Sequence, residues 1–466
     1  MDTVLSQIFL YLASIYMING ILINIFRRLK LADFIAHILT GIVFSLLLLG
    51  WGEFFGSAGT APFNHNGQLD LFFRQSQLNS AAAEGDTLNP VLSPDSAAMP
   101  VAGETNARVD ALPPEIAAAD NPDAHFLLLI KFMITVGLLL FLMQLGLNFD
   151  PRFFRMKKEE NTWRQVGIFA GLTALIVGLS SYFLVLERDL LLSGLTVIAF
   201  LSIHIGAVLS YNFPVSARMQ RPFIFLIQLA ILLDIIVIGI YSALEIYVKY
   251  QNYTFSKHGI HGIYLLILLL FVIPIVFNKA SVAIFKTLSK WMGEYTLLLK
   301  LGILFFFFYA GFQAELSVLL LGLWAELLFN ALMDISEFEF RQKFFAGASF
   351  LYILPFVEIG RSLFFGELYQ REFWIHLGVM IGALVLVSLV MGFLQRGERQ
   401  YPLVISAGTF PRGELTVLII WLFKEIGWIP LSVFTLLVVV VIVTNLIGTV
   451  MGKILFIRPL RRQMRT

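Results

Sequence analysis

Apolar residues in this chain fall in long blocks that are separated by polar stretches. Each block is about as long as the helix needed to cross roughly 30 Å of hydrocarbon at about 1.5 Å per residue. The thirteen blocks are 4–26, 31–51, 125–148, 164–186, 191–211, 221–246, 260–279, 294–312, 315–332, 343–366, 374–394, 401–423 and 430–451. They lack the polar face that a helix on a soluble core carries. The pattern therefore predicts an all-α membrane protein with about 13 transmembrane helices.

The composition agrees with this prediction. The chain has 466 residues, of which 58% are hydrophobic and 14% are charged, and its mean hydropathy is +0.82. A soluble domain carries about 25% charged residues. The chain has no cysteine, which excludes disulfides and thiolate metal sites. The net charge of +2 gives no indication of a nucleic-acid partner, and we expect none.

The distribution of basic residues indicates the orientation of the helices. If the N-terminus lies outside, most of the 33 lysines and arginines fall in inside loops. The outside loops hold Arg74, Arg108, Arg188, Lys249, Lys257, Arg371 and Lys424. We therefore expect a multi-pass plasma membrane protein, in a bacterial inner membrane, with its N-terminus outside and its C-terminus in the cytoplasm.

Four regions follow from these patterns. Residues 1–52 form the first two helices, and residues 123–452 form helices three to thirteen. Residues 53–122 are rich in Ala, Asp, Asn, Ser, Gly and Pro and show no sustained period. Such a stretch buries too little apolar area to offset its ordering entropy, so we expect a largely disordered extracytoplasmic insert. Residues 453–466 form a basic cytoplasmic tail.

Asp234 is the most informative charged residue. It lies near the middle of the block 221–246, with no charged neighbour for a helical turn on either side. A charge at that depth costs at least about 2.5–3.5 kcal/mol. A desolvated carboxyl holds either a proton or a metal cation, and this competition is the basis of cation/proton exchange. The alternative is a packing role in which the carboxyl hydrogen-bonds a neighbouring backbone.

The segment SAGTFPRGELTVLII in the twelfth block predicts a broken helix. Pro411 lacks a backbone donor, and Gly408 and Gly413 flank it. The freed backbone groups are tolerated at membrane depth only where protein or water covers them. Arg412 and Glu414 lie at this break, where they would line an ion site. The alternative is a proline kink at which these two charges neutralise each other.

The segment SGLTVIAFLSIHIGAVLSY in the fifth block carries a polar patch of Ser202, His204 and Gly206. Such residues often hydrogen-bond between helices without a transport role. However, the fifth and twelfth blocks are seven helices apart and so cross the membrane in opposite directions. Two interrupted helices in oppositely oriented halves predict inverted repeats with two discontinuous crossing helices around a binding site.

The remaining intramembrane charges carry less information. Glu358 and Arg361 are three residues apart on one helix face, which favours a structural ion pair. Lys300 and Glu326 have no assigned role. The chain contains no P-loop, HExxH motif or cysteine cluster, so we expect neither an enzyme nor a cofactor.

Taken together, these segments resemble the monovalent cation:proton antiporter-2 family, including Kef-type potassium/proton exchangers. The similar segments are LADFIAHILTGIVFS, LLLFLMQLGLNFD, AGFQAELSVLLLGLWAEL, LPFVEIGRSL and, most specifically, GTFPRGELTVLIIWLFKEIGWIPLSVFTLLVVVVIVTNLIG. The insert at 53–122 has no counterpart in the family pattern. The resemblance implies a homodimer in which each protomer has a dimerisation domain and a six-helix ion-translocating core that moves like an elevator.

The resemblance also implies roles for the candidate residues. Asp234 matches the aspartate that binds the cation and the proton, Ser202 to His204 fall in the first broken helix, and Arg412 and Glu414 match an Arg-Gly-Glu motif.

Two departures from the family pattern restrict the mechanism. The family usually carries Asp, Asn or Gln where this chain has Leu233, and electrogenic members carry a lysine where the chain offers only Ser388. These departures favour electroneutral antiport of one monovalent cation, Na⁺ or K⁺, for one proton, by alternating access around Asp234. Leu233 and the insert also suggest an alternative, a transport-inactive membrane sensor or scaffold. A passive channel is a third hypothesis.

Overall fold

The structure is a computed structural model, and the part of the chain that it describes is helical and contains no strand. It describes residues 2–29, 32–55, 122–146, 162–186, 188–204, 217–251, 279–280, 283, 287, 296–313, 317–332, 338–394 and 402–463. Twelve of the thirteen predicted blocks overlap described helices, and the twelfth block overlaps two of them, α17 and α18. All but the last residue of the block 260–279, and nearly all of the insert 53–122, lie outside the described residues.

The first half of the chain contributes α1 (Asp2–Leu29), α2 (Asp33–Phe55), α5 (Pro122–Gly146), α7 (Thr162–Ser180), η2 (Ser181–Val185), α8 (Leu190–Phe200) and α10 (Ala217–Gln251). The second half contributes α13 (Thr296–Gln313), α14 (Val318–Leu332), α15 (Phe338–Arg361), η7 (Phe365–Tyr369), α16 (Arg371–Leu394), α17 (Pro402–Thr409), α18 (Glu414–Glu425) and α19 (Leu431–Gln463). The predicted tail at 453–466 therefore begins inside α19. The fifth block was predicted as a helix to residue 211, but α8 already ends at Phe200.

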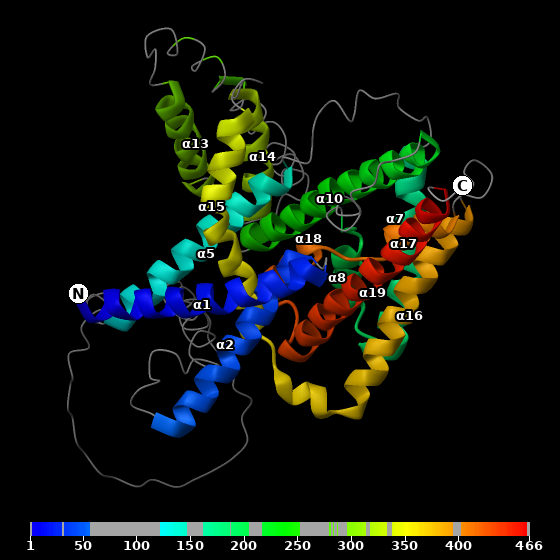
Figure 1. Ribbon diagram of the computed structural model, residues 1–466, viewed down its shortest axis with the longest axis horizontal. Helices are drawn as coiled ribbons and strands as arrows, with labels where there is room; N and C mark the ends of the chain where they lie inside the picture. The colour runs from blue at the N-terminus through cyan, green and yellow to red at the C-terminus, as the bar shows by residue number, and fades with distance from the viewer. Residues whose placement is uncertain are drawn as a thin grey trace, which may run out of the picture. The chain divides into compact units, whose positions relative to one another are not determined.

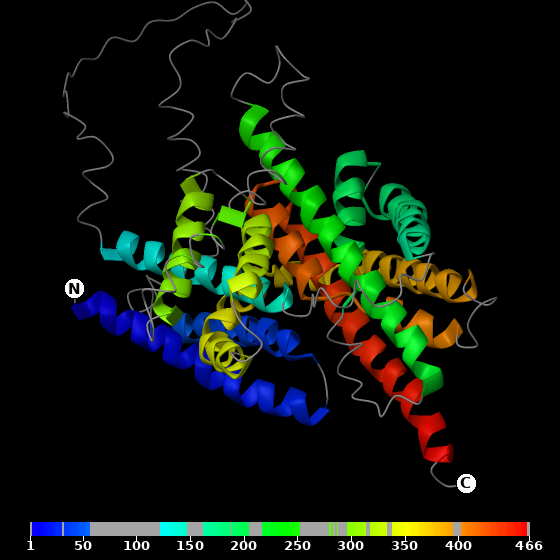
Figure 2. The same cartoon turned by 90° about the horizontal axis from the view of Figure 1, so that it is seen from above.

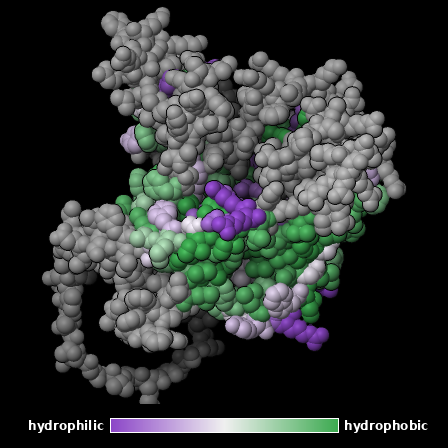
Figure 3. Space-filling model, viewed as in Figure 1, coloured by the Kyte–Doolittle hydropathy of each residue, from purple (hydrophilic) through white to green (hydrophobic). Residues whose placement is uncertain are grey.

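Six described helical segments are long and apolar enough to cross a membrane. They are Tyr11–Leu29, Trp163–Val185, Ile224–Glu245, Arg371–Leu394, Pro402–Glu425 and Leu431–Met451. Large apolar side chains such as Phe305, Phe306 and Trp374 are exposed on the outside of the helices. The described surface in Figure 3 is accordingly hydrophobic over most of its area. The protein is a multi-pass membrane protein whose apolar faces are solvated by lipid.

The chain divides into two compact units. One comprises Met1–Ile15 and Val43–Phe132, and within it Tyr11 packs edge-on against Phe44. The other comprises Tyr16–Ile42 and Met133–Thr466, and all the candidate site residues belong to it.

The helices of the second unit pack around two segments, the end of α8 and the α17–α18 connection. Helix α10 contacts α7, α8 and α17, and α8 also contacts α18. Both α17 and α18 pack on α19, as Figures 1 and 2 show. This arrangement brings the end of α8, the middle of α10 and the α17–α18 connection together.

Helices α2 and α15 approach each other with their backbones in contact. A Cβ on Gly41 would overlap the carbonyl oxygen of Val357, and a Cβ on Gly360 would overlap that of Ile38. Small residues permit such close packing between membrane helices. The contact places the first turns of α2 beside Phe356 and the site.

Candidate ion-binding site

Asp234 is buried in the middle of α10, with 2% of its surface exposed. Its carboxylate Oδ1 accepts a hydrogen bond from the Ser202 hydroxyl at 2.6 Å. Ser202 is also buried and belongs to the non-helical segment 201–204 that follows α8. The contact therefore provides two oxygen atoms, one of them a carboxylate, at one point in the interior.

The twelfth predicted helix is broken at the expected position. Helix α17 ends at Thr409 and α18 begins at Glu414, and residues 410–413 between them are not helical. The carbonyl oxygen of Pro411 accepts a hydrogen bond from the backbone N–H of His204 at 3.1 Å. The two non-helical segments thus satisfy part of each other's freed backbone groups, which is the condition for irregular backbone inside a membrane.

Arg412 ties the same two segments together through its side chain. It is fully buried, and its Nη1 donates to the carbonyl oxygen of Ser202 at 3.3 Å. Its guanidinium carbon lies 5.3 Å from the ring centroid of Phe169, a cation–π geometry. Nε and Nη2 have no hydrogen-bond partner among the described residues. A carbonyl group and an aromatic face, rather than Glu414, therefore surround this cation.

Glu414 contacts a histidine. Its Oε2 lies 3.2 Å from Nδ1 of His204, and its side chain is 24% exposed whereas His204 is buried. As the first residue of α18, Glu414 also lies where the helix dipole favours a negative charge. Gly413 leaves room for this pair, since a Cβ there would stand 3.0 Å from Nδ1 of His204.

The structure also describes several of the other predicted residues. Glu358 and Arg361 form a two-fold hydrogen-bonded pair on α15, at 2.7 and 2.9 Å. Lys300, Leu233 and Ser388 are buried. The side chain of Glu326, and Gly206, lie outside what the structure describes.

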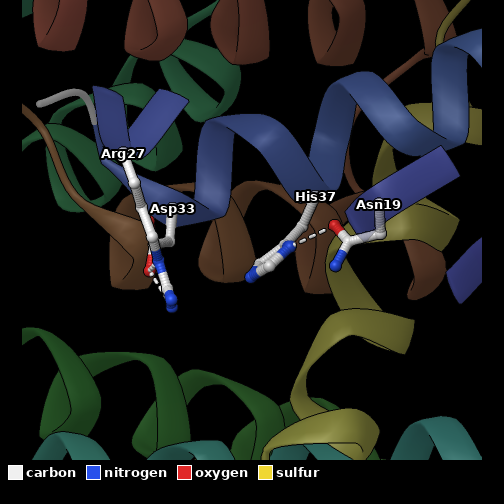
Figure 4. Close-up of polar contacts among 4 residues, drawn as sticks. All are labelled: Asn19, Arg27, Asp33 and His37. Carbon is white, nitrogen blue, oxygen red and sulfur yellow. Dashed lines mark hydrogen bonds and ion pairs between the residues drawn. The ribbon is translucent and has the colours of Figure 1, made fainter. Parts of the chain in front are cut away.

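Three residues near the site were not selected from the sequence: His37, Asn19 and Thr40. The Nδ1 atom of His37 on α2 lies 2.7 Å from Oδ1 of Asn19 on α1, and Figure 4 shows the two side chains facing each other. Thr40 adds a contact of 3.2 Å to the same oxygen. The sequence does mark these three residues, because each is a polar residue inside an apolar block. Neutral polar residues often link membrane helices, so the sequence alone does not distinguish them.

Comparison with known proteins supports the fold. No protein-family model and no curated protein matches the sequence. The structure resembles that of the sodium proton antiporter MjNhaP1 from Methanocaldococcus jannaschii at pH 8, with a TM-score of 0.54 over 96% of each chain. The two sequences are 14% identical, so the similarity concerns the fold. The chain therefore has the fold of a sodium proton antiporter.

Proposed function

We propose that this protein is a secondary transporter that exchanges a monovalent cation, Na⁺ or K⁺, for a proton at Asp234. The observation that supports this most is the buried contact between Asp234 and Ser202, at the place where two non-helical segments meet. The structure also resembles that of a sodium proton antiporter, which adds support from the fold. A carboxylate that is excluded from water must be neutralised by a proton or by a cation.

The proposed exchange follows from this competition. When a cation enters from one side, it takes the place of the proton on the Asp234 carboxylate, and the Ser202 hydroxyl adds an oxygen ligand. Alternating access then exposes the site to the other side, where the proton displaces the cation. In the family that the sequence resembles, a polar residue usually stands at the position of Leu233, and electrogenic members have a lysine near that of Ser388. We therefore propose that the exchange is electroneutral.

The wider proposal covers family, assembly and orientation. The chain is a member of the antiporter-2 family that forms a homodimer in a bacterial inner membrane, with its N-terminus outside. Segment 201–204 and the α17–α18 connection belong to the two discontinuous crossing helices of an inverted repeat. Glu358 and Arg361 form a structural pair.

Purified full-length protein in proteoliposomes with an internal pH-sensitive dye tests the function. Addition of Na⁺ or K⁺ should produce a saturable pH change that persists when the membrane potential is clamped. The Asp234→Asn variant should abolish the response, because the amide holds neither a proton nor a compensating charge.

The matched control is Asp189→Asn, at the exposed N-cap of α8, where the amide oxygen can still accept from Leu192. This variant should exchange as the wild type does. No response of the wild type to Na⁺, K⁺ or Li⁺, or full activity of Asp234→Asn, would exclude exchange at Asp234 and favour the sensor hypothesis. A response without saturation indicates a channel.

A further inference from the structure

Phe34, in the first turn of α2, reaches the candidate site from outside α8, α10 and the α17–α18 connection, which form that site. The centroid of its ring lies 5.5 Å from that of the His204 ring, and the two ring planes are inclined by 66°. Phe34 and His204 are each 2% exposed, so both rings are shielded from water. Edge-on pairs of rings at this spacing are favourable beyond the apolar area that they bury, and their geometry is specific. The contact therefore restrains the orientation of the His204 ring.

The position of Phe34 is itself fixed by polar contacts on either side of it along α2. Asp33, the residue before Phe34, pairs with Arg27 of α1 at 3.0 Å. His37, about one helical turn after Phe34, places its Nδ1 atom 2.7 Å from Oδ1 of Asn19 on α1. Figure 4 shows both contacts. The first turns of α2 are therefore held against α1 at two points, with Phe34 between them.

Phe34 is also supported from α15 and α5. The ring centroid of Phe356 on α15 lies 6.1 Å from that of Phe34, and Phe141 on α5 packs edge-on against Phe356 at 5.1 Å. The backbones of α2 and α15 touch at Gly41 and Gly360, where a Cβ would overlap a carbonyl oxygen of the other helix. Close-packed interiors transmit strain instead of absorbing it. Phe34 therefore presents its ring from a rigid support.

His204 connects this support to the proposed ion ligands. Its backbone N–H donates to the carbonyl oxygen of Pro411 at 3.1 Å, and its Nδ1 atom lies 3.2 Å from Oε2 of Glu414. His204 is also two residues after Ser202, whose hydroxyl donates to the Asp234 carboxylate at 2.6 Å. A displacement of the His204 ring therefore changes the contact with Glu414 and disturbs the short segment that carries the Ser202 hydroxyl.

We propose that Phe34 is a positioning residue for the ion-binding site. It keeps the His204 ring against Glu414, and thereby keeps the Ser202 hydroxyl beside the Asp234 carboxylate, where the two oxygens receive the cation. This inference rests on the proposed function. Without the ring of Phe34, His204 turns away from Glu414, and the cation meets oxygens that are less well placed. The effect falls on cation affinity, because Phe34 acts through His204 and leaves the Asp234 carboxylate itself unchanged.

The transport test compares Phe34→Leu with Phe44→Leu. Phe34→Leu keeps an apolar side chain but removes the flat ring. In proteoliposomes it should raise the half-saturating cation concentration about fivefold and change the maximal rate less than about twofold. Phe44 is the matched control, because it lies on the same helix, is 4% exposed and packs edge-on against Tyr11 at 5.3 Å. Phe44→Leu should match the wild type. An unchanged half-saturating concentration in Phe34→Leu, or an equal rise in Phe44→Leu, overturns the proposal.

A second measurement does not depend on transport. In full-length protein with ¹⁵N-labelled histidines in lipid nanodiscs, the His204 signals are those missing from His204→Gln. Glu414→Gln should shift the Nδ1 signal of His204, and should shift it less than about half as far when Phe34→Leu is also present. Combined with Phe44→Leu, Glu414→Gln should give the full shift. Equal shifts with and without Phe34 overturn the proposal. Retained exchange in Asp234→Asn would instead overturn the proposed function, so the two failures are distinguishable.

Discussion

Among the places in the second unit that hold charged side chains inside the protein, two are built differently. On α15, Glu358 and Arg361 lie one helical turn apart and bind each other through two hydrogen bonds. At the candidate site, each charged side chain contacts an element other than the one that carries it. Asp234 on α10 meets Ser202, and Glu414 on α18 meets His204.

This difference separates structural charge from charge that can take part in transport. A pair within one helix neutralises itself wherever that helix goes, so its formation requires nothing of the rest of the fold. The site depends on the meeting of segments 201–204 and 410–413, and any movement of these segments changes its electrostatics. Under the proposed function, charges held between separate elements respond to a proton or a cation, and the α15 pair serves stability.

The largest effect should come from Arg412→Met. The methionine keeps the volume but gives no hydrogen bond to the carbonyl oxygen of Ser202, so segment 201–204 loses a contact to the break. We expect exchange to fall about a hundredfold, while the protein still folds because a buried cation with unpaired N–H groups is removed. Exchange in proteoliposomes and thermal unfolding in detergent measure the two parts. A folded Arg412→Met variant with wild-type exchange would show that the break does not depend on this contact.

Ser202→Ala should have a smaller effect. It removes the hydroxyl that donates to Asp234, and a hydrogen bond to a charged group contributes about 1.5–3 kcal/mol, so exchange should fall about tenfold or more. The control is Ser406→Ala, whose hydroxyl donates to the carbonyl of Pro402 in its own helix. That variant should stay within about twofold of the wild type. Equal losses in both would contradict a specific role for the Asp234 contact.

Gly413→Ala should reduce exchange moderately, about threefold to fivefold, because the added methyl crowds His204 and its contact with Glu414. The backbone at Gly413 is extended, so alanine introduces no strain of its own. The comparison is Gly382→Ala on α16, where no atom lies within 4 Å of the new Cβ. Gly382→Ala should leave exchange unchanged, and a similar loss there would rule out the crowding explanation.

The smallest effect on exchange should come from Arg361→Met. It leaves Glu358 without its partner, so unfolding should become easier by about 3 kcal/mol. Exchange per folded molecule should change less than about twofold, since the pair lies outside the site. The double variant Glu358→Gln/Arg361→Met should recover most of the stability in thermal unfolding. If exchange of folded Arg361→Met falls as far as that of Ser202→Ala, the distinction between the two places is wrong.

The sequence predicted parts of the site to different degrees. Pro411 indicated the break because a proline lacks the backbone N–H that the interior of a helix needs, whatever surrounds it. Asp234 stood out because a lone carboxyl in hydrocarbon is costly wherever its helix packs. The end of α8 at Phe200 had no such signal, since no proline or glycine lies between Gly194 and the polar patch. His37 and Asn19 also escaped selection, because neutral polar residues in an apolar block are common in membrane helices.

What the sequence determined by itself was the membrane class, the apolar blocks and the residues that carry charge within them. These features follow from the transfer of each residue into hydrocarbon, a cost that depends on the residue and not on its neighbours. Only the tertiary structure decided which residues meet: Ser202 with Asp234 across 32 positions, and Arg412 with Ser202 across 210. Many pairings satisfy the same polar groups, and close packing of α8, α10 and the α17–α18 connection selects one of them.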